Sequence, residues 1–192
     1  IAAKRFIVVD KAYDEFERKF VELMKKVKVG NPMDTKTELG PIAREDLLFE
    51  LEGQVRRSVK NDAKILCGGS RIDKEGYYFE PTILANVLPG TPTYEEEIFG
   101  PVAILITAKD EADAIRIAND SPYGLGASLW TKNIEKAKQL AAKIESGSVF
   151  INGMVKSDPR LPFGGIKSSG YGRELSHYGI KEFVNVKTVW IK

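Results

Sequence analysis

The sequence predicts an α/β fold in which a mostly parallel sheet is flanked by helices. From residue 102 onward, short apolar runs alternate with stretches of 3.6-residue periodicity, the pattern of strands joined by helical crossovers. Val102–Ala108 is apolar at nearly every position, as expected for a strand buried on both faces. The 192 residues are 43% hydrophobic and 29% charged, values typical of a globular domain.

The N-terminal half is expected to hold two amphipathic helices among short strands. A strand at Lys4–Val9 leads into a helix for which Asp10 is the predicted N-cap, and Gly30 and Pro32 end that helical stretch. Apolar side chains at helical spacing define the two helices: Tyr13, Phe16, Phe20, Leu23, Met24 and Val27, then Leu47, Leu48, Leu51, Val55 and Val59. Further strands are expected at 63–67 and at 77–86, the latter interrupted at Pro81.

The C-terminal half is expected to continue as alternating helices and strands. Asp110 and Asn133 are predicted N-caps of helices that run through Asn119 and Ile144. Strands are predicted at Leu125–Trp130, at Ser148–Asn152 and, as a long terminal strand, at Val184–Ile191.

Composition excludes several classes of function. The net charge of +2, from 29 basic and 27 acidic residues, gives no basis for a nucleic-acid or membrane-surface partner, and no apolar run approaches the ~20 residues of a membrane span. One cysteine and one histidine cannot form the usual tetrahedral metal site. Cys67 lies in an apolar stretch and is interpreted as a buried structural residue, and His177 as part of a surface helical turn. A single cysteine favours a cytoplasmic location.

Residues 152–173 form a segment rich in Gly, Pro and Ser that follows a predicted strand. Long loops at the carboxyl ends of strands are where open α/β sheets bind ligands. The segment is therefore predicted to be a ligand-binding loop, and a surface loop without chemical function is the alternative.

Two motifs resemble signatures of the NAD(P)-dependent aldehyde dehydrogenase superfamily. The sequence EEIFGPV at Glu96–Val102 is similar to one of them. PFGGIKSSGYGRE at Pro162–Glu174 is similar to the C-terminal loop motif of that family. Weaker similarities run through the whole chain, as at Gly76–Leu84 and Ala118–Thr131. The resemblance implies the aldehyde dehydrogenase catalytic-domain fold and an oxidoreductase that converts an aldehyde to its acid through a cysteine thiohemiacetal and thioester, with NAD or NADP as cofactor.

The same resemblance implies that no catalytic residue lies in this chain. The family's nucleophilic cysteine is expected just before Ile1, and the general-base glutamate and the Rossmann-like cofactor domain further upstream. We therefore expect a fragment that is inactive alone, with residues 1–183 as a partial catalytic domain. Residues 184–192 are expected to be a C-terminal strand used in subunit association, in a homodimer or homotetramer.

Two residues are assigned to the cofactor by resemblance. Glu97 resembles the carboxylate that accepts hydrogen bonds from the nicotinamide ribose hydroxyls, a role that suits an ionised acceptor. Phe99 resembles the aromatic residue beside the nicotinamide ring. The alternative for Glu97 is a solvated charge within the run of three glutamates at 95–97.

Three loop residues are assigned to the substrate. The tail Glu174–Trp190 most resembles the succinate-semialdehyde dehydrogenase branch, in which a serine at the place of Ser157 helps to hold the distal carboxylate. Arg160 is expected to assist because guanidinium suits a carboxylate, and Phe163 chiefly to support the loop. Exposed polar residues without a role remain the alternative for Ser157 and Arg160. Specificity for another aldehyde, and a non-catalytic self-associating module, remain alternative functions.

Overall fold

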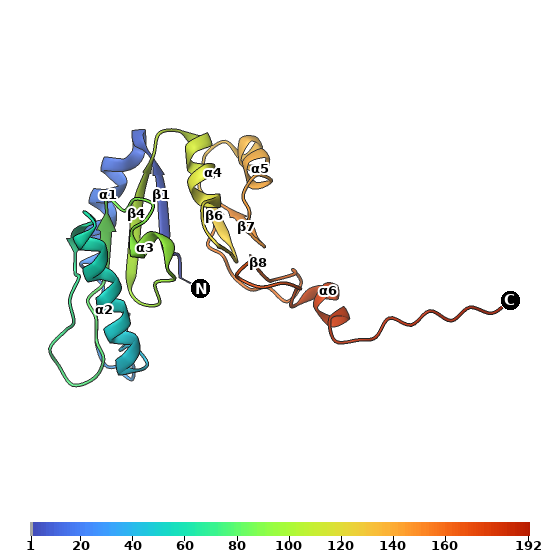
Figure 1. Ribbon diagram of the computed structural model, residues 1–192, viewed down its shortest axis with the longest axis horizontal. Helices are drawn as coiled ribbons and strands as arrows, with labels where there is room; N and C mark the ends of the chain where they lie inside the picture. Colours follow the sequence, from blue (N-terminus) through green and yellow to red (C-terminus); the bar gives the residue numbers. More distant parts are fainter. Residues whose placement is uncertain (1) are drawn as a thin grey trace. The chain divides into compact units, whose positions relative to one another are not determined.

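The structure is a computed structural model that describes residues 2–192, and residues 2–114 and 115–192 form two compact units (Figure 1). The first unit is built on a four-stranded sheet of order β1-β4-β3-β2. Its strands are β1 (Arg5–Val9), β2 (Lys64–Cys67), β3 (Thr82–Ala85) and β4 (Val102–Ala108). The central strand β4 is parallel to β1 and β3, and β2 pairs antiparallel at one edge. The prediction of a mostly parallel sheet is confirmed.

Both faces of this sheet are buried. Helix α1 (Asp10–Met24) packs on the face that presents Ile83 and Leu105, whose side chains are 0% and 1% exposed. Phe20 of α1 stacks near Phe6 of β1 with ring centroids 4.5 Å apart. Because side chains alternate along a strand, Leu84 and Ile104 point to the opposite face, and they are buried too. Burial on two faces explains the nearly continuous apolar sequence of β4.

Helix α2 (Glu45–Lys60) packs against the short helix α3 (Pro92–Glu95). Its buried stripe contains the apolar residues Leu48, Leu51 and Val55 at helical spacing. Ser58 lies on the same face, and its Oγ accepts a hydrogen bond from the backbone N–H of Thr93 at 3.0 Å. This bond attaches α3 to α2 and directs the chain toward the turn that precedes β4.

The helix N-caps differ from the predictions at one position. Asp10 is the first residue of α1 and not its cap, because Val9 holds the extended cap conformation and no side chain caps the helix. Asp110 does cap α4 (Glu111–Asn119), since its Oδ1 accepts from the N–H of Asp113 at 2.9 Å. Helix α4 begins in the first unit and ends in the second.

The second unit holds two small two-stranded sheets. Strand β5 (Tyr123–Gly124) pairs antiparallel with β8 (Ile166–Lys167), and β6 (Ala127–Leu129) pairs parallel with β7 (Val149–Ile151). Between β6 and β7 lies α5 (Ile134–Ala141), capped as predicted by Asn133, whose Oδ1 accepts from the N–H of Lys136 at 3.0 Å. The last helix is α6 (Ser176–Lys181). The strands predicted here are therefore shorter than expected and belong to separate sheets.

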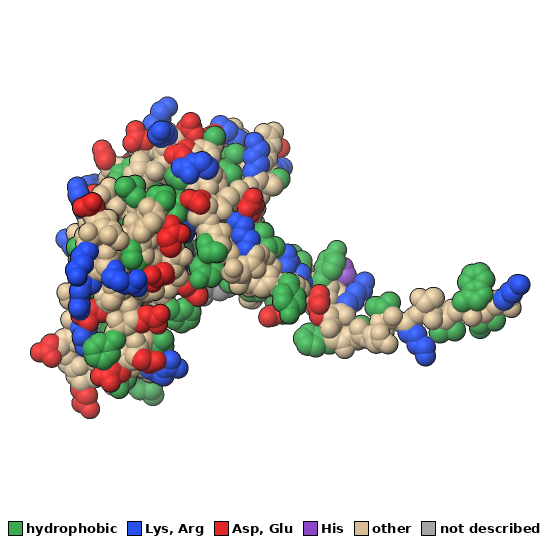
Figure 2. Space-filling view, in the orientation of Figure 1, with side chains coloured by type: hydrophobic (Ala, Val, Ile, Leu, Met, Phe, Trp, Pro, Cys, Tyr) green, Lys and Arg blue, Asp and Glu red, His purple; other side chains and the backbone are tan. Residues whose placement is uncertain are grey.

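The glycine-rich loop, residues 152–173, is more ordered than predicted. It contains β8, and Phe163 and Glu174 form an isolated antiparallel bridge. The terminal strand predicted at Val184–Ile191 does not form within the single chain, where the residues after α6 form neither helix nor strand (Figure 1). A strand needs a neighbour to pair with its backbone groups, and none lies beside this segment in residues 2–192. Its apolar side chains are mostly in solvent (Figure 2), and Trp190 is 82% exposed.

Candidate active site

The turn Glu96–Pro101, which we call the pre-β4 turn, carries both residues predicted to bind the cofactor. Ile98 at its centre is buried, with 3% of its surface exposed. The residues on either side of it, Glu97 and Phe99, are exposed, and Phe99 retains 70% of its accessible surface. Ile98 therefore anchors the turn in the core, while a carboxylate and an aromatic ring project from the surface of the unit.

Helix α2 holds the start of this turn. Gln54 Nε2 donates to Glu96 Oε2 at 3.0 Å and to the backbone oxygen of Glu97 at 3.1 Å. Arg57 forms a two-pronged contact with the Glu96 carboxylate, at 2.8 and 2.9 Å. The hydrogen bonds from Arg57 hold the pKa of Glu96 below its usual value. Two of the three consecutive glutamates thus have structural contacts: Glu96 with α2, and Glu95, whose Oε1 accepts from the N–H of Gly90 at 2.8 Å. Glu97 is exposed.

The residue that precedes β1 holds the end of the turn. The Nζ of Lys4 donates to the backbone oxygen of Gly100 at 2.8 Å. Partial burial lowers the pKa of Lys4, and the nearby negative charge of Glu97 counteracts that shift. Gly100 lies directly against α2, since a Cβ added there would be only 2.4 Å from Leu51 Cδ2. Any side chain at residue 100 would displace the turn from the helix.

The groups that the pre-β4 turn presents fit a nicotinamide nucleotide. A carboxylate accepts hydrogen bonds from a ribose diol, and an exposed phenyl ring offers an apolar face to a flat heterocycle. When bound, NAD(P)+ would supply the hydride acceptor of the reaction. Glu97 and Phe99 would hold and orient it, on a backbone fixed from both ends.

The residues assigned to the substrate lie in the glycine-rich loop of the second unit. A cavity of about 440 Å³ lies beside β7. It is lined by Ser148, Val149, Phe150, Ile151, Lys156, Asp158, Leu161, Pro162 and Phe163. Phe163 thus lines the cavity, whereas Ser157 is exposed and is absent from the lining.

Arg160 is already paired within the loop. Its Nε and Nη2 contact the two carboxylate oxygens of Asp158 at 2.9 and 2.6 Å, and its side chain is 85% exposed. These hydrogen bonds lower the pKa of Asp158 to about 2. The sequence analysis missed Asp158, although its spacing two residues before an arginine, across Pro159, was a signal for such a pair.

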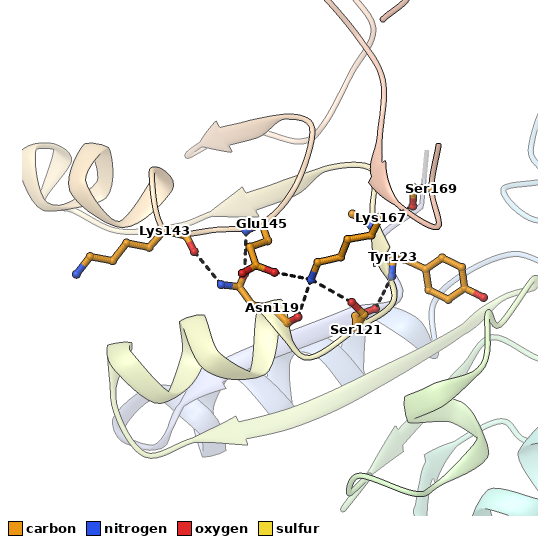
Figure 3. Close-up of polar contacts among 8 residues, drawn as sticks. Asn119, Ser121, Tyr123, Lys143, Glu145, Lys167 and Ser169 are labelled. Atoms are coloured by element: carbon orange, nitrogen blue, oxygen red, sulfur yellow. Dashed lines mark hydrogen bonds and ion pairs between the residues drawn. The ribbon is translucent and has the colours of Figure 1, made fainter. Parts of the chain in front are cut away.

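A polar network fixes the far end of the same loop (Figure 3). Lys167 of β8 directs its Nζ to the backbone oxygens of Asn119 and Ser121, at 2.8 and 3.1 Å, and to Glu145 Oε2 at 2.7 Å. The side chain of Asn119 in turn donates to the oxygen of Lys143 and accepts from the N–H of Glu145. Three chain segments therefore meet at Lys167, which has a left-handed backbone φ of 53°. The sequence analysis did not identify this lysine.

Cys67 and His177 have the structural character predicted for them. Burial raises the pKa of the Cys67 thiol, which opposes formation of a nucleophilic thiolate. His177 lies on the short helix α6, with its ring centroid 4.1 Å from that of Tyr178. Within residues 2–192 no cluster of three His, Cys, Asp or Glu side chains has the geometry to hold a metal ion, and no helix is long and apolar enough to span a membrane.

Known proteins are similar to this chain along nearly its whole length. The model of the aldehyde dehydrogenase family matches residues 1–189. A probable succinate-semialdehyde dehydrogenase [NADP(+)] of Synechocystis is 51% identical over 191 residues, and a succinate semialdehyde dehydrogenase [NAD(P)+] of Escherichia coli is 47% identical over 189. The matched regions cover 100% and 98% of this chain but 42% and 41% of those proteins. The chain thus spans well under half the length of the relatives it matches.

Solved structures show the same similarity in three dimensions. The succinic semialdehyde dehydrogenase of Streptococcus pyogenes, in complex with NADP+, superimposes with a TM-score of 0.95 at 45% sequence identity. The superimposed region covers 98% of this chain and 41% of the Streptococcus pyogenes chain. The betaine aldehyde dehydrogenase of Staphylococcus aureus, in complex with NAD+, gives 0.90 at 36% identity, covering 94% of this chain and 37% of its own. The predicted fold class and the resemblance found in the sequence are both confirmed.

Proposed function

Because this chain belongs to the aldehyde dehydrogenase family, we propose that it forms part of an enzyme that oxidises succinate semialdehyde to its acid with NAD(P)+. One observation carries this proposal. Glu97 and Phe99 project on either side of the buried Ile98, in a turn whose backbone is held by α2 and by Lys4. The similarity to two succinate-semialdehyde dehydrogenases, at 51% and 47% identity, supports succinate semialdehyde as the substrate.

In the proposed mechanism this chain orients the reactants. The Glu97 carboxylate would accept hydrogen bonds from the ribose hydroxyls of the cofactor, and Phe99 would limit the position of the nicotinamide ring. Cys67 does not serve as the nucleophile, since it is buried and its pKa is raised. In this proposal the thiolate that attacks the aldehyde belongs to a residue of the full-length protein other than Cys67.

We propose Ser157, Arg160 and Phe163 as the contribution of this chain to substrate binding. Phe163 lines the cavity beside β7, which supports its role in shaping the site. The Ser157 hydroxyl is exposed and could donate to a carboxylate. Arg160 is held by Asp158, so it would attract a substrate carboxylate only as part of a pair that already contains one negative charge. Ser157 is therefore the stronger candidate.

A parent enzyme for another aldehyde is the second candidate function. The similarity to a betaine aldehyde dehydrogenase, whose name implies a cationic substrate, supports it. The paired charges of Asp158 and Arg160 leave this part of the loop without a strong preference for either sign of substrate.

We also propose that the protein forms homo-oligomers in the cytoplasm, with residues 1–183 as catalytic-domain sequence and 184–192 as an association segment. The exposed Val184 and Val186 alternate with polar residues, and a run of exposed apolar residues follows at 189–191, a composition suited to a strand that pairs with another chain. The single buried cysteine fits a reducing compartment. Sedimentation of the protein with and without residues 184–192 tests the association.

The test of the main proposal is aldehyde-dependent reduction of NAD+ and NADP+ by the full-length protein that contains this chain. We expect Glu97→Gln to raise the KM for the cofactor about tenfold, since a charge-assisted hydrogen bond contributes roughly 1.5 kcal/mol or more. Glu95→Gln, a neighbouring exposed carboxylate, serves as the matched control and should change it by no more than about twofold.

The substrate is tested separately with a panel of aldehydes. Ser157→Ala should raise the KM for succinate semialdehyde more than that for an uncharged aldehyde of similar length. An unchanged preference would remove Ser157 from the proposal, and a preference for a cationic aldehyde in the wild type would favour the second candidate function.

A further inference from the structure

Helix α2 carries a buried polar residue whose hydrogen bonds leave the helix. Gln54 is 3% exposed, between the equally buried Leu51 and Val55. A buried amide costs free energy unless its groups are bonded, so an apolar residue would serve packing alone better. Gln54 Nε2 donates two hydrogen bonds to the pre-β4 turn, to Glu96 Oε2 and to the backbone oxygen of Glu97. The position of this amide is therefore explained by the turn and not by the helix.

Arg57 completes the contact one turn further along α2. Its guanidinium meets both oxygens of Glu96, at 2.8 and 2.9 Å, and its side chain is 54% exposed. An exposed ion pair adds little stability, but a two-pronged pair fixes orientation as well as distance. The Glu96 carboxylate thus accepts hydrogen bonds from both Gln54 and Arg57, and a single peptide bond joins Glu96 to Glu97.

The opposite end of the turn is also held, by Lys4 at the oxygen of Gly100. Ile98, between the two attachments, is buried. Of the turn, only the side chains of Glu97 and Phe99 thus remain exposed beyond these attachments. Gln54, Arg57 and Glu96 form what we call the α2 clamp.

We propose that the α2 clamp is a positioning device for the cofactor: Gln54 and Arg57 set the location of the Glu97 carboxylate and the Phe99 ring without touching the nucleotide. This inference rests on the proposed function, because it assumes that Glu97 and Phe99 bind NAD(P)+. Misplacing a contact group by an ångström weakens catalysis strongly, so loss of the clamp reduces cofactor affinity while the aldehyde site in the other unit is unaffected.

The test compares Gln54→Met and Arg57→Met with Arg56→Met in the full-length protein. Arg56 is the adjacent arginine, is 65% exposed and pairs with Glu52 at 3.5 Å, so it controls for loss of a surface charge on α2. Calorimetry gives the dissociation constants of NAD+ and NADP+, and hydrogen exchange of peptides covering residues 95–101 is followed without cofactor. Kinetics give the KM for the aldehyde.

We expect both clamp variants to bind the preferred cofactor about three- to tenfold more weakly, and their turn amides to exchange faster. The aldehyde KM and all values of the Arg56→Met control should stay within about twofold of the wild type. Restoring the guanidinium–carboxylate pair in reversed order, with Arg57→Glu and Glu96→Arg together, should recover part of the affinity lost in Arg57→Met. Cofactor affinity and exchange rates that remain at wild-type values in both clamp variants would overturn the positioning role.

Failure of the inference differs from failure of the proposed function. A wild-type protein that binds neither nucleotide contradicts the proposed function, and the inference with it, whereas a wild-type protein that binds while the clamp variants bind equally well contradicts the clamp alone. Circular dichroism checks the fold. Should Gln54→Met not fold, Arg57→Met and Glu96→Gln decide the outcome, since both side chains are more than a third exposed.

Discussion

The pre-β4 turn carries the proposed cofactor contacts and the glycine-rich loop carries the proposed substrate contacts, and different forces hold these two regions. The turn stands on a dense apolar core: the fully buried large side chains, Phe79, Ile83 and Leu105 among them, lie in residues 2–114. In residues 115–192 the buried hydrophobic residues are only Ile117 and Ala137. The loop is fixed instead by polar contacts such as those of Lys167, and by close backbone approaches such as Gly147 against the oxygen of Gly164.

This difference suits the two proposed roles. A cofactor that is the same for every substrate needs a rigid contact surface, and an apolar core packed on both faces of a sheet provides one. A loop that selects among aldehydes benefits from being attached at few points, because its sequence can change without loss of the core. The second unit also exposes more of its apolar surface, at Trp130, Met154 and Trp190.

The largest expected effect is in the apolar core. Leu105→Ala removes a side chain that is 1% exposed at the centre of the sheet, and we expect it to lower the free energy of unfolding by about 3 kcal/mol. Leu23→Ala, at a leucine that is 63% exposed, is the matched control and should change it by less than about 0.5 kcal/mol. Urea unfolding measures both. Equal effects would show that the first unit is not held by its core.

A smaller effect is expected from the polar network. Lys167→Met leaves Glu145 and two carbonyl oxygens without their cation and should destabilise the second unit by about 1–2 kcal/mol. Lys138→Met removes a lysine at the same 2.7 Å from a carboxylate, but in an exposed pair worth less than about 0.5 kcal/mol. Hydrogen exchange of residues 119–124 reports the change. A comparison of the two variants separates the effect of burying a lysine–carboxylate pair from the effect of losing a lysine charge.

Helix caps give a third, local comparison. Asn133→Ala removes the side-chain acceptor at the start of α5 and should cost about 1 kcal/mol. Asp10→Ala should cost less than about 0.5 kcal/mol, because Asp10 lies within the first turn of α1 and makes no cap hydrogen bond. Thermal unfolding of the two variants measures the difference. A larger loss for Asp10→Ala would contradict the assignment of Val9 as the cap.

The smallest effect is the pH response of the loop. The Asp158 pKa in the folded protein is about 2, below the ordinary value of 3.8. A depressed carboxyl pKa stabilises the folded state above about pH 4, and this contribution is lost as the pH falls toward 2. Carbon NMR titration should give a pKa near 2 for the Asp158 carboxyl group, and Arg160→Ala should raise that pKa toward 3.8. A wild-type value near 3.8 would show that the pair is not formed in solution.

Local sequence predicted the elements well where periodicity was strong. The helical spacing of Leu48, Leu51 and Val55 predicted α2, and the apolar run of β4 predicted a strand buried on both faces. Local sequence did not predict the structure where the pairing of one strand with another decides whether a strand forms. Residues 184–191 have the composition of a strand, yet no strand forms there, because backbone groups can pair only with a neighbouring strand.

The candidate site shows the same division. Glu97 and Phe99 were predicted because they lie in a contiguous motif, and their exposure follows from the alternation around Ile98. Ser157 was assigned by its place in the resembling branch and Arg160 by the affinity of guanidinium for carboxylates, and both assignments stay predictions. The pairing of Arg160 with Asp158 was not predicted. The α2 clamp and the Lys167 network were missed, because the hydrogen-bond partners of Gln54, Arg57 and Lys167 lie 39 to 48 residues away in the sequence.

By itself, the sequence determined the family, the fold class and the types of the main elements, because these depend on contiguous motifs and on the periodicity of apolar residues. Only the tertiary structure decided which two of the three glutamates are held by hydrogen bonds, which lysine joins three segments and which apolar run stays unpaired within the chain. Hydrogen bonds and ion pairs between residues far apart in the chain form only when the donor–acceptor distance is right to within a few tenths of an ångström. Such distances have no local pattern in the sequence and arise only when the elements pack.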